Sequence, residues 1–181
     1  MNKIILIIIS ALISGYIHAD VGDKWPSEQE LSKAPTWPSK YNGNPRLCNK
    51  PNEELFYKYQ NDVGYVDEEA YEIDSYIDLN LDGICEIIAF QRMYCGNKEC
   101  GYIAFQVTKQ GVKDLGQVAL GDFLAPLNGW LQIRSRSYTG AHYSIHLVKF
   151  INGSYRFYRS DRFEYFEKNN QTKYIKTDYR K

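Results

Sequence analysis

Residues 130–151, WLQIRSRSYTGAHYSIHLVKFI, carry the pattern that decides the fold class. Apolar and polar side chains alternate over 130–138 and again over 142–151, on either side of Thr139-Gly140. Successive side chains of a strand point to opposite faces, so the alternation predicts two strands that each have one solvated face. The Thr-Gly pair between them predicts the turn of an antiparallel hairpin.

Turn signals separate further alternating segments along the chain. Asn-Gly pairs at 128–129 and 152–153 are typical of tight hairpin turns, because both central residues of such a turn take positive φ. The segments between turns predict strands near residues 71–77, 84–94, 101–109, 114–120, 130–138, 142–151 and 154–166. We therefore expect an all-β fold, an antiparallel β-meander in an open sandwich or barrel-like form. The chain lacks a crossover-helix pattern, which argues against parallel α/β architectures.

The first quarter of the chain differs from this β-rich region. It opens with one lysine and an apolar run shorter than the roughly 20 residues that span a bilayer, which predicts a signal peptide at 1–19, cleaved after Ala19. Residues 20–47 hold most of the six prolines and predict an extended arm. A single β-rich domain is expected at 48–181.

A minor helical part is expected near the N-terminus. Ser27 and Glu30 are spaced as the cap of one helical turn within the arm. Acidic residues gather at the start of a second candidate helix, at 52–60.

The net charge and polarity of the chain argue against two kinds of partner, nucleic acid and the membrane interior. Removal of 1–19 takes away one lysine and no carboxylate, which leaves a net charge of −1. This balance does not indicate nucleic-acid binding. The remaining chain is too polar to span a membrane, so we expect it to be soluble and exported, in the periplasm or secreted.

The four cysteines form an even set in a chain that we expect to be exported, where disulfides form and persist. Cys95 and Cys100 flank a four-residue turn between two predicted strands and are expected to pair across it, which leaves Cys48 for Cys85. The other two pairings remain open, because four cysteines allow three. A zinc knuckle is the competing interpretation, but the spacing differs from that of zinc ribbons and a second close pair is lacking.

Residues 77–90, IDLNLDGICEIIAF, place oxygen-bearing side chains at alternate positions before a strand. Such oxygens are the ligands that calcium prefers, and Gly83 permits the sharp turn that brings them together. An EF-hand would need a glutamate where Ala89 stands, followed by a helix. The candidate ligands are Asp78, Asn80, Asp82, the carbonyl of Ile84 and Glu86.

The pattern DxNxDGxxE at 78–86 resembles the calcium-binding loops of FG-GAP and VCBS-type β repeats. The resemblance implies a structural Ca²⁺ held by these ligands at one hairpin. Leu81 departs from the usual glycine and Glu86 from the commoner aspartate. A propeller needs at least about four blades, and the chain has one copy, so the resemblance is to one loop. The competing interpretation is a metal-free Asx turn, in which side chains bond their own backbone.

One predicted strand combines arginines with aromatic side chains on the same face. Arginine and aromatic residues are enriched at protein interfaces, and they also stack on sugars. This pattern predicts a binding face for a protein or glycan partner; the alternative is that the aromatics belong to the core and the arginines only solvate the surface. The candidate partner-binding residues are Trp130, Arg134, Arg136 and Tyr138.

Catalytic motifs are not evident in the sequence. His142 and His146 are four residues apart, which in a strand separates them by about 13 Å. The chain has no nucleophile elbow, zinc-protease motif or phosphate-binding loop. Carboxylate pairs suited to glycoside hydrolysis can still meet in space, and the available acids are Asp122, Asp161 and Glu164.

Together these patterns predict a calcium-stabilised binding module in the bacterial envelope, which acts as an inhibitor or immunity factor against a wall-degrading enzyme. The bacterial source is inferred from the abundance of Ile, Lys, Asn and Tyr. The alternative is a hydrolase of envelope polysaccharide with dispersed carboxylates.

Overall fold

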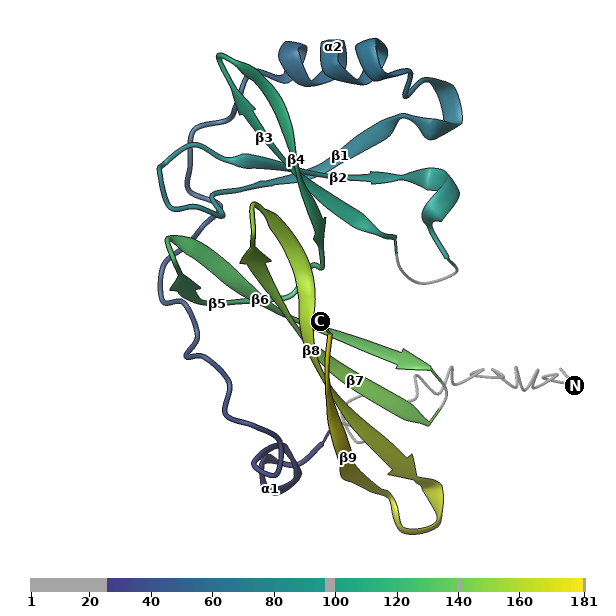
Figure 1. Cartoon of the computed structure of the whole chain (residues 1–181). Coiled ribbons are helices and arrows are strands. Elements are labelled where there is room, and N and C mark those ends of the chain that lie inside the picture. The colour runs from purple at the N-terminus through teal and green to yellow at the C-terminus, as the bar shows by residue number, and fades with distance from the viewer. Residues whose placement is uncertain (1–25, 97–99, 140, 181) are drawn as a thin grey trace, which may run out of the picture.

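Within the residues that the structure describes, nine strands form one curled sheet that closes into a half-barrel (Figure 1). The structure is a computed structural model that describes residues 26–96, 100–139 and 141–180, and the predicted signal peptide lies outside these ranges. The strands are β1 (Tyr71–Ile77), β2 (Glu86–Gln91), β3 (Tyr102–Thr108), β4 (Gly111–Val118), β5 (Asp122–Leu127), β6 (Trp130–Thr139), β7 (His142–Ile151), β8 (Ser154–Phe166) and β9 (Gln171–Tyr179).

Both predicted helices are present; α1 begins at the predicted cap, and α2 begins within a residue of its predicted start. Helix α1 (Glu28–Leu31) starts after Ser27, whose hydroxyl accepts a hydrogen bond from the Glu30 amide. Helix α2 (Glu53–Val63) starts after Asn52, whose side-chain oxygen accepts from the Glu54 amide at 2.9 Å. Such bonds satisfy amides that the first turn of a helix leaves without a partner. Short 3-10 turns lie at Asp67–Glu69 (η2), Arg92–Tyr94 (η3) and Glu167–Asn169 (η4).

The strands form two antiparallel meanders rather than one. The first runs from β1 to β4 and the second from β5 to β9. They join through a parallel contact between β4 and β8, in which Gly116 pairs with Tyr155. This contact brings together two segments that are separated in the sequence by the three strands β5 to β7, so alternation within each segment gave no sign of it.

Strands β5 and β9 were not among the predicted strands. Strand β5 contains Pro126 and a register shift between Leu124 and Leu127, which break the regular alternation. Strand β9 lacks the apolar alternation of a half-buried strand, because five of its nine residues are exposed. It pairs only with β8. A polar composition is common at sheet edges, where it discourages pairing with other chains.

The core divides into three clusters. Helix α2 covers the first meander (Figure 1) and places the buried ring of Phe56 5.1 Å from that of Phe105. A second cluster, which includes Ala34 of the arm, lies against β7 and β8. The central cluster spans both meanders and consists of Ile77, Leu79, Ile88, Ala104, Leu115, Val118, Ile133, Val148 and Tyr155.

The chain between α1 and α2 runs along the edge of the sheet and ties the meanders together. Ser39 and Tyr41 exchange backbone hydrogen bonds with β5 at 2.7 and 2.9 Å. Further along, the carbonyl of Pro45 accepts from the amide of Asp78 at 2.7 Å. The segment predicted as an extended arm is thus paired with the sheet at several points.

A buried arginine holds the start of this segment against β8. The Arg159 guanidinium bonds the carboxylate of Asp161 at 3.0 Å, and both side chains are almost completely buried. Its two terminal nitrogens also donate to the carbonyls of Thr36 and Pro35, its Nε has no hydrogen-bond partner among the described residues, and the guanidinium stacks on the Trp37 ring, 4.1 Å from the ring centroid. A buried charge needs this degree of compensation, because desolvation of an unpaired one costs several kcal/mol.

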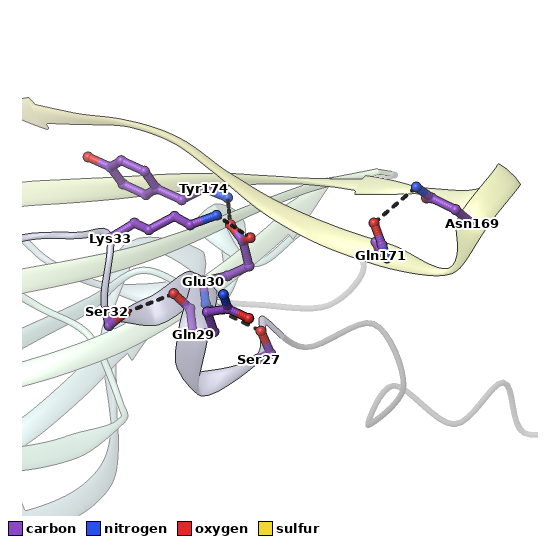
Figure 2. A network of polar contacts seen from close by, with 8 residues as sticks. All are labelled: Ser27, Gln29, Glu30, Ser32, Lys33, Asn169, Gln171 and Tyr174. Carbon is purple, nitrogen blue, oxygen red and sulfur yellow. Dashed lines mark hydrogen bonds and ion pairs between the residues drawn. The ribbon is translucent and has the colours of Figure 1, made fainter.

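Helix α1 is anchored to the last strand by Glu30, as Figure 2 shows. One carboxylate oxygen accepts from the backbone amide of Tyr174 at 2.7 Å, and the other accepts from the Lys33 ammonium at 2.5 Å. The bond from Lys33, and then that from Tyr174, lower the pKa of Glu30. The first helix and the last strand of the described chain are therefore in direct contact.

Two disulfides join the pairs predicted from the sequence. Cys48 bonds Cys85 and so fixes the arm to the start of β2, and Cys95 bonds Cys100 between β2 and β3. Over residues 26–96, 100–139 and 141–180, no helix combines the length and apolar character needed to cross a membrane.

Replacement of Gly116 by alanine is expected to lower the free energy of unfolding by about 2–3 kcal/mol. Gly116 has a φ of 90°, and an added Cβ would lie 2.3 Å from the Ser154 hydroxyl oxygen and 2.7 Å from the Tyr155 carbonyl oxygen. Strained backbone costs about 1–3 kcal/mol before the steric clash is counted. Urea unfolding followed by circular dichroism measures the loss.

Gly129→Ala is the matched control. Its φ is 81°, but a Cβ there meets nothing within 4 Å, so only the backbone strain of about 1–2 kcal/mol applies. Equal losses for the two variants would contradict the role assigned to the close approach at residue 116.

Candidate functional site

The predicted calcium loop is folded by hydrogen bonds from its own side chains. The Asp78 carboxylate accepts from the amides of Asp82 and Gly83 at 3.1 and 2.9 Å. The side-chain oxygen of Asn80 also accepts from the Asp82 amide, and the Asp82 carboxylate accepts from the Ile84 amide at 2.8 Å. The bonds accepted by Asn80 and Asp82 come from amides two residues further on and are those of Asx turns, which were the competing interpretation of the sequence, whereas the bonds accepted by Asp78 span four and five residues.

The loop lies at the seam between the two meanders. The carbonyl of Leu79 accepts a hydrogen bond from the amide of Leu131 in β6 at 2.8 Å. Cys85, at the other end of the loop, is covalently bonded to Cys48, which directly follows the arm. The loop is therefore part of the framework that holds the halves of the sheet together.

Glu86 is buried at the base of the loop with 1% of its surface exposed. Its carboxyl oxygens accept from the Leu79 amide at 2.8 Å and from the Gln106 side-chain amide at 3.4 Å. The pKa of this carboxyl is raised to about 7, mainly by burial and to a smaller extent by the negative charges of Asp82 and Asp78. The hydrogen bond from Leu79 acts in the opposite direction. Two of the three acids of the loop, Asp78 and Glu86, are thus buried, whereas Asp82 is exposed.

The donor set suits calcium chemically, whereas the arrangement is that of hydrogen-bonded turns. Across the described ranges, no three His, Cys, Asp or Glu side chains converge in a way that would hold a metal ion. The backbone of the loop takes positive φ at two positions. Leu81, which stands where those loops have glycine, takes a left-handed φ of 60°, and Gly83 takes 85°.

Of the four candidate partner-binding residues, Trp130 packs in the core, and only the backbone of Tyr138 is described. The Trp130 ring stacks on Phe150, with centroids 3.9 Å apart and planes 17° apart, and packs against the central core. For Tyr138 the backbone pairs with Tyr143 of β7, and its side chain lies outside the described part.

The two arginines lie near one carboxylate but differ in exposure. Arg134 bonds Asp122 through two nitrogens, at 2.6 and 3.2 Å, and its side chain is 33% exposed. This pairing lowers the pKa of Asp122. Arg136 lies 3.9 Å from the same carboxylate, and its side chain is 55% exposed. Arg134 is thus the closer partner of Asp122, and Arg136 presents more of its charge to solvent.

A pocket of about 600 Å³ opens where β4 diverges from β8 after their contact at Gly116. It combines a cation, hydroxyl and amide groups with apolar walls, a mixture typical of ligand sites. Its lining is Gly96, Cys100, Gly101, Tyr102, Gln117, Val118, Ala119, Leu120, Ser135, Arg136, Ser137, His146 and Phe157.

Within this pocket His146 contacts a serine that the sequence did not single out. Its Nε2 lies 2.8 Å from the Ser137 hydroxyl oxygen, and its ring meets Phe157 edge to face. Burial is the main cause that lowers the pKa of His146, with smaller contributions from Arg180 and Arg162. The register of β6 and β7 makes this contact, and only the correct pairing of the two predicted strands would have revealed it.

The acids considered for glycoside hydrolysis have structural contacts. Asp122 is bonded to Arg134, and the fully buried Asp161 bonds Arg159 and Thr177. Glu164 lines a separate shallow pocket with His142. Among the described residues, no carboxylate lines the pocket beside β4.

A comparison with protein-family models, curated proteins and solved structures found no match for this chain.

The stability of the metal-free protein is expected to fall as the pH rises from 5 to 7. A group whose folded pKa lies above its unfolded value stabilises the fold below the unfolded pKa, and this contribution is lost as the pH passes the folded pKa. For Glu86 the unfolded pKa is 4.5 and the folded pKa is about 7. The free energy of unfolding therefore decreases by about 2–3 kcal/mol between pH 5 and pH 7. Urea unfolding at several pH values, with EDTA present, measures this decrease.

Glu86→Gln provides the control, because the amide has the same shape and does not titrate in this range. The difference in stability between the wild type and this variant isolates the carboxyl from all other groups. A difference that stays constant from pH 5 to 7 would show that Glu86 has an ordinary pKa.

Proposed function

We propose that this protein is an exported binding module that acts on a protein partner in the bacterial envelope, as an inhibitor or immunity factor against a wall-degrading enzyme. The observation that carries the proposal is the position of Arg136. Its side chain is 55% exposed, and the residue is one of those that line the pocket beside β4. An exposed arginine beside a concave, partly apolar surface is the kind of feature that anchors protein interfaces.

The region around the pocket supplies further interface chemistry. Leu120 is 37% exposed on its rim, and a second hollow shares Gly101 and Gln117 with it and extends toward Tyr94, which is 65% exposed. Exposed aromatic and apolar side chains next to a guanidinium give a partner both area to bury and a charge to pair.

The two disulfides support export to an oxidising compartment. Both link cysteines that would otherwise be thiols, and thiols are kept reduced in the cytosol. The proposed location is therefore the periplasm or the cell exterior.

Calcium is proposed as a structural ligand of the loop at the seam. Asp78, Asn80, Asp82, the Ile84 carbonyl and Glu86 would hold it, and the ion would offset the mutual repulsion of three carboxyl groups. The left-handed backbone at Leu81 and Gly83 supports this proposal, because it turns the chain sharply between the candidate ligands Asn80, Asp82 and the Ile84 carbonyl.

Millimolar calcium is expected to raise the melting temperature by about 2–4 °C, and EDTA to reverse the change. Extracellular calcium modules bind with Kd on the order of 10⁻⁴ to 10⁻³ M, so millimolar calcium stabilises the fold by about 1 kcal/mol. Asp82→Ala should abolish the shift, whereas Glu68→Ala, an exposed acid outside the loop, should retain it. A melting curve that is the same in calcium and EDTA would favour the metal-free Asx turn.

Arg136→Ala is expected to weaken capture of the partner from an envelope extract and to leave stability within about 0.5 kcal/mol of the wild type. Arg134→Ala should cost up to about 1 kcal/mol, since it removes the closer partner of the half-exposed Asp122. Arg46→Ala, an exposed arginine on the arm, is the control.

Capture is measured by pull-down, with mass spectrometry to identify the retained protein. A turbidity assay with cell-wall substrate tests whether the module inhibits a wall-degrading enzyme or degrades the wall itself. Equal capture by wild type and Arg136→Ala would remove Arg136 from the interface, and lysis by the purified protein alone would favour the hydrolase.

A further inference from the structure

We infer that the pocket beside β4 and the hollow next to it form one groove that binds a neutral oligosaccharide of N-acetylated sugar units, with an acetamido group beside Ser137. The pocket has a volume of about 600 Å³ and the second hollow about 390 Å³, and both lie within the range of about 300–1,000 Å³ for small-molecule sites. The ligand is a sugar chain and therefore goes beyond the proposed protein partner.

The two hollows meet at Gly101 and Gln117, which line both of them. Gly101 has no side chain to separate the hollows, and a Cβ placed there would lie 4.0 Å from the side-chain nitrogen of Gln117. From this junction the pocket extends to Phe157, and the second hollow extends to Tyr94. A ligand of several linked rings can therefore occupy both hollows, whereas a single ring occupies one.

The polar side of the pocket is uncharged, although Arg136 is among the lining residues. Ser135 pairs with His146 between β6 and β7, and Ser137 contacts His146 at 2.8 Å, so these three side chains share one face of the sheet. Alternation along β6 turns Arg136 to the opposite face, where its guanidinium lies 3.9 Å from Asp122. Burial is the main cause that lowers the pKa of His146, which leaves the ring neutral at pH 7. A neutral ligand therefore matches this side of the pocket.

The Ser137 hydroxyl has a proton to donate to such a ligand. The Nδ1 of His146 is buried and has no hydrogen-bond partner among the described residues. Buried N–H groups without a partner are rarer in proteins than buried acceptors without one. We therefore assign the ring proton to Nε2, which donates to the Ser137 oxygen and leaves the serine proton for a ligand oxygen. In this tautomer His146 is a donor rather than a base, so the pair is suited to binding and not to nucleophilic catalysis.

Apolar side chains lie around this donor. Val118 is buried, Phe157 is half-buried, and Leu120 is 37% exposed. An acetamido group combines a carbonyl oxygen, which accepts from a hydroxyl, with a methyl group that gains from apolar contact. The hydroxyl group of an unmodified sugar has no methyl group and does not extend as far. The pocket therefore favours an N-acetylated sugar over its hydroxyl counterpart.

The second hollow offers an aromatic ring and amide groups to a neighbouring sugar unit. Tyr94 is 65% exposed there, and Gln91 and Gln117 contribute side-chain amides. The Gln91 amide is held in place, because its nitrogen donates to the Glu69 carbonyl. The C–H face of a pyranose ring packs against an aromatic ring, and its hydroxyl groups both donate and accept hydrogen bonds. These uncharged groups are therefore matched to a neutral sugar.

The experiment is a titration of the ¹⁵N-labelled wild-type protein with chitotriose, a β-linked chain of N-acetylglucosamine, followed by NMR. We expect saturable shifts of the backbone amides of Tyr94, Gly101, Gln117 and Ser137. Cellotriose is the matched control, because it has the same linkage and a hydroxyl in place of each acetamido group. It should bind at least about tenfold more weakly, since it loses the methyl contact and the carbonyl acceptor.

Variants identify the donor and the junction. Ser137→Ala should lower the affinity for chitotriose by about fivefold, because it removes one hydrogen bond. Ser39→Ala makes the same change on the exposed arm and should leave the affinity unchanged. Gly101→Leu places a side chain between the hollows and should reduce chitotriose binding to that of single N-acetylglucosamine, which should itself bind as it does to the wild type. The dispersion of the amide spectrum verifies that each variant is folded.

Four results would overturn the inference: no saturable shift with chitotriose, equal affinities for chitotriose and cellotriose, shifts that map away from the groove, or an affinity that neither Ser137→Ala nor Gly101→Leu lowers. Each is independent of the protein partner, because the titration uses the purified chain and capture uses an envelope extract. Failure of the pull-down with a positive titration would leave the sugar site intact and remove the protein interface alone.

Discussion

The two halves of the sheet depend on the close approach of the Gly116 backbone to that of Tyr155. The pair is the whole register of the parallel contact between β4 and β8. It allows the Tyr155 ring to enter the central core, where its hydroxyl bonds the Leu131 carbonyl at 2.9 Å. The divergence of the strands beyond this point opens the pocket. Gly116, which has no side chain, thus permits both the contact between the two meanders and the cavity beside that contact.

The second link between the two meanders is the 78–86 loop, which is less stable because its acidic side chains repel one another. The 78–86 loop bonds β6 through Leu79, and the disulfide at Cys85 attaches the arm to the same place. The loop carries three acidic side chains, one of them almost completely buried. Carboxylates placed this close together oppose one another, so the seam responds to anything that neutralises them, whether a proton or a cation.

The strands with one wet face were predictable, because their alternation is a local property. Strand β7 has the predicted bounds, and Ser27 and Asn52 cap the helices. The parallel joint and the pocket were not predictable, since they arise from contacts between distant segments. Of the residues on the expected binding face, Trp130 joined the core because β6 is buried on both sides near its start. The arginines kept the surface position that their charge requires.

The bond between Glu30 and Tyr174 joins residues 144 positions apart. The arm is made first by the ribosome, yet the strand that receives it is made last. Chains dominated by such distant contacts fold slowly, because the entropy of closing a long loop is lost before the contact forms and stabilises the fold. The contact between helix α1 and β9 therefore forms only after β9 has been synthesised, whereas the rest of the arm can already pair with β5 and with Asp78.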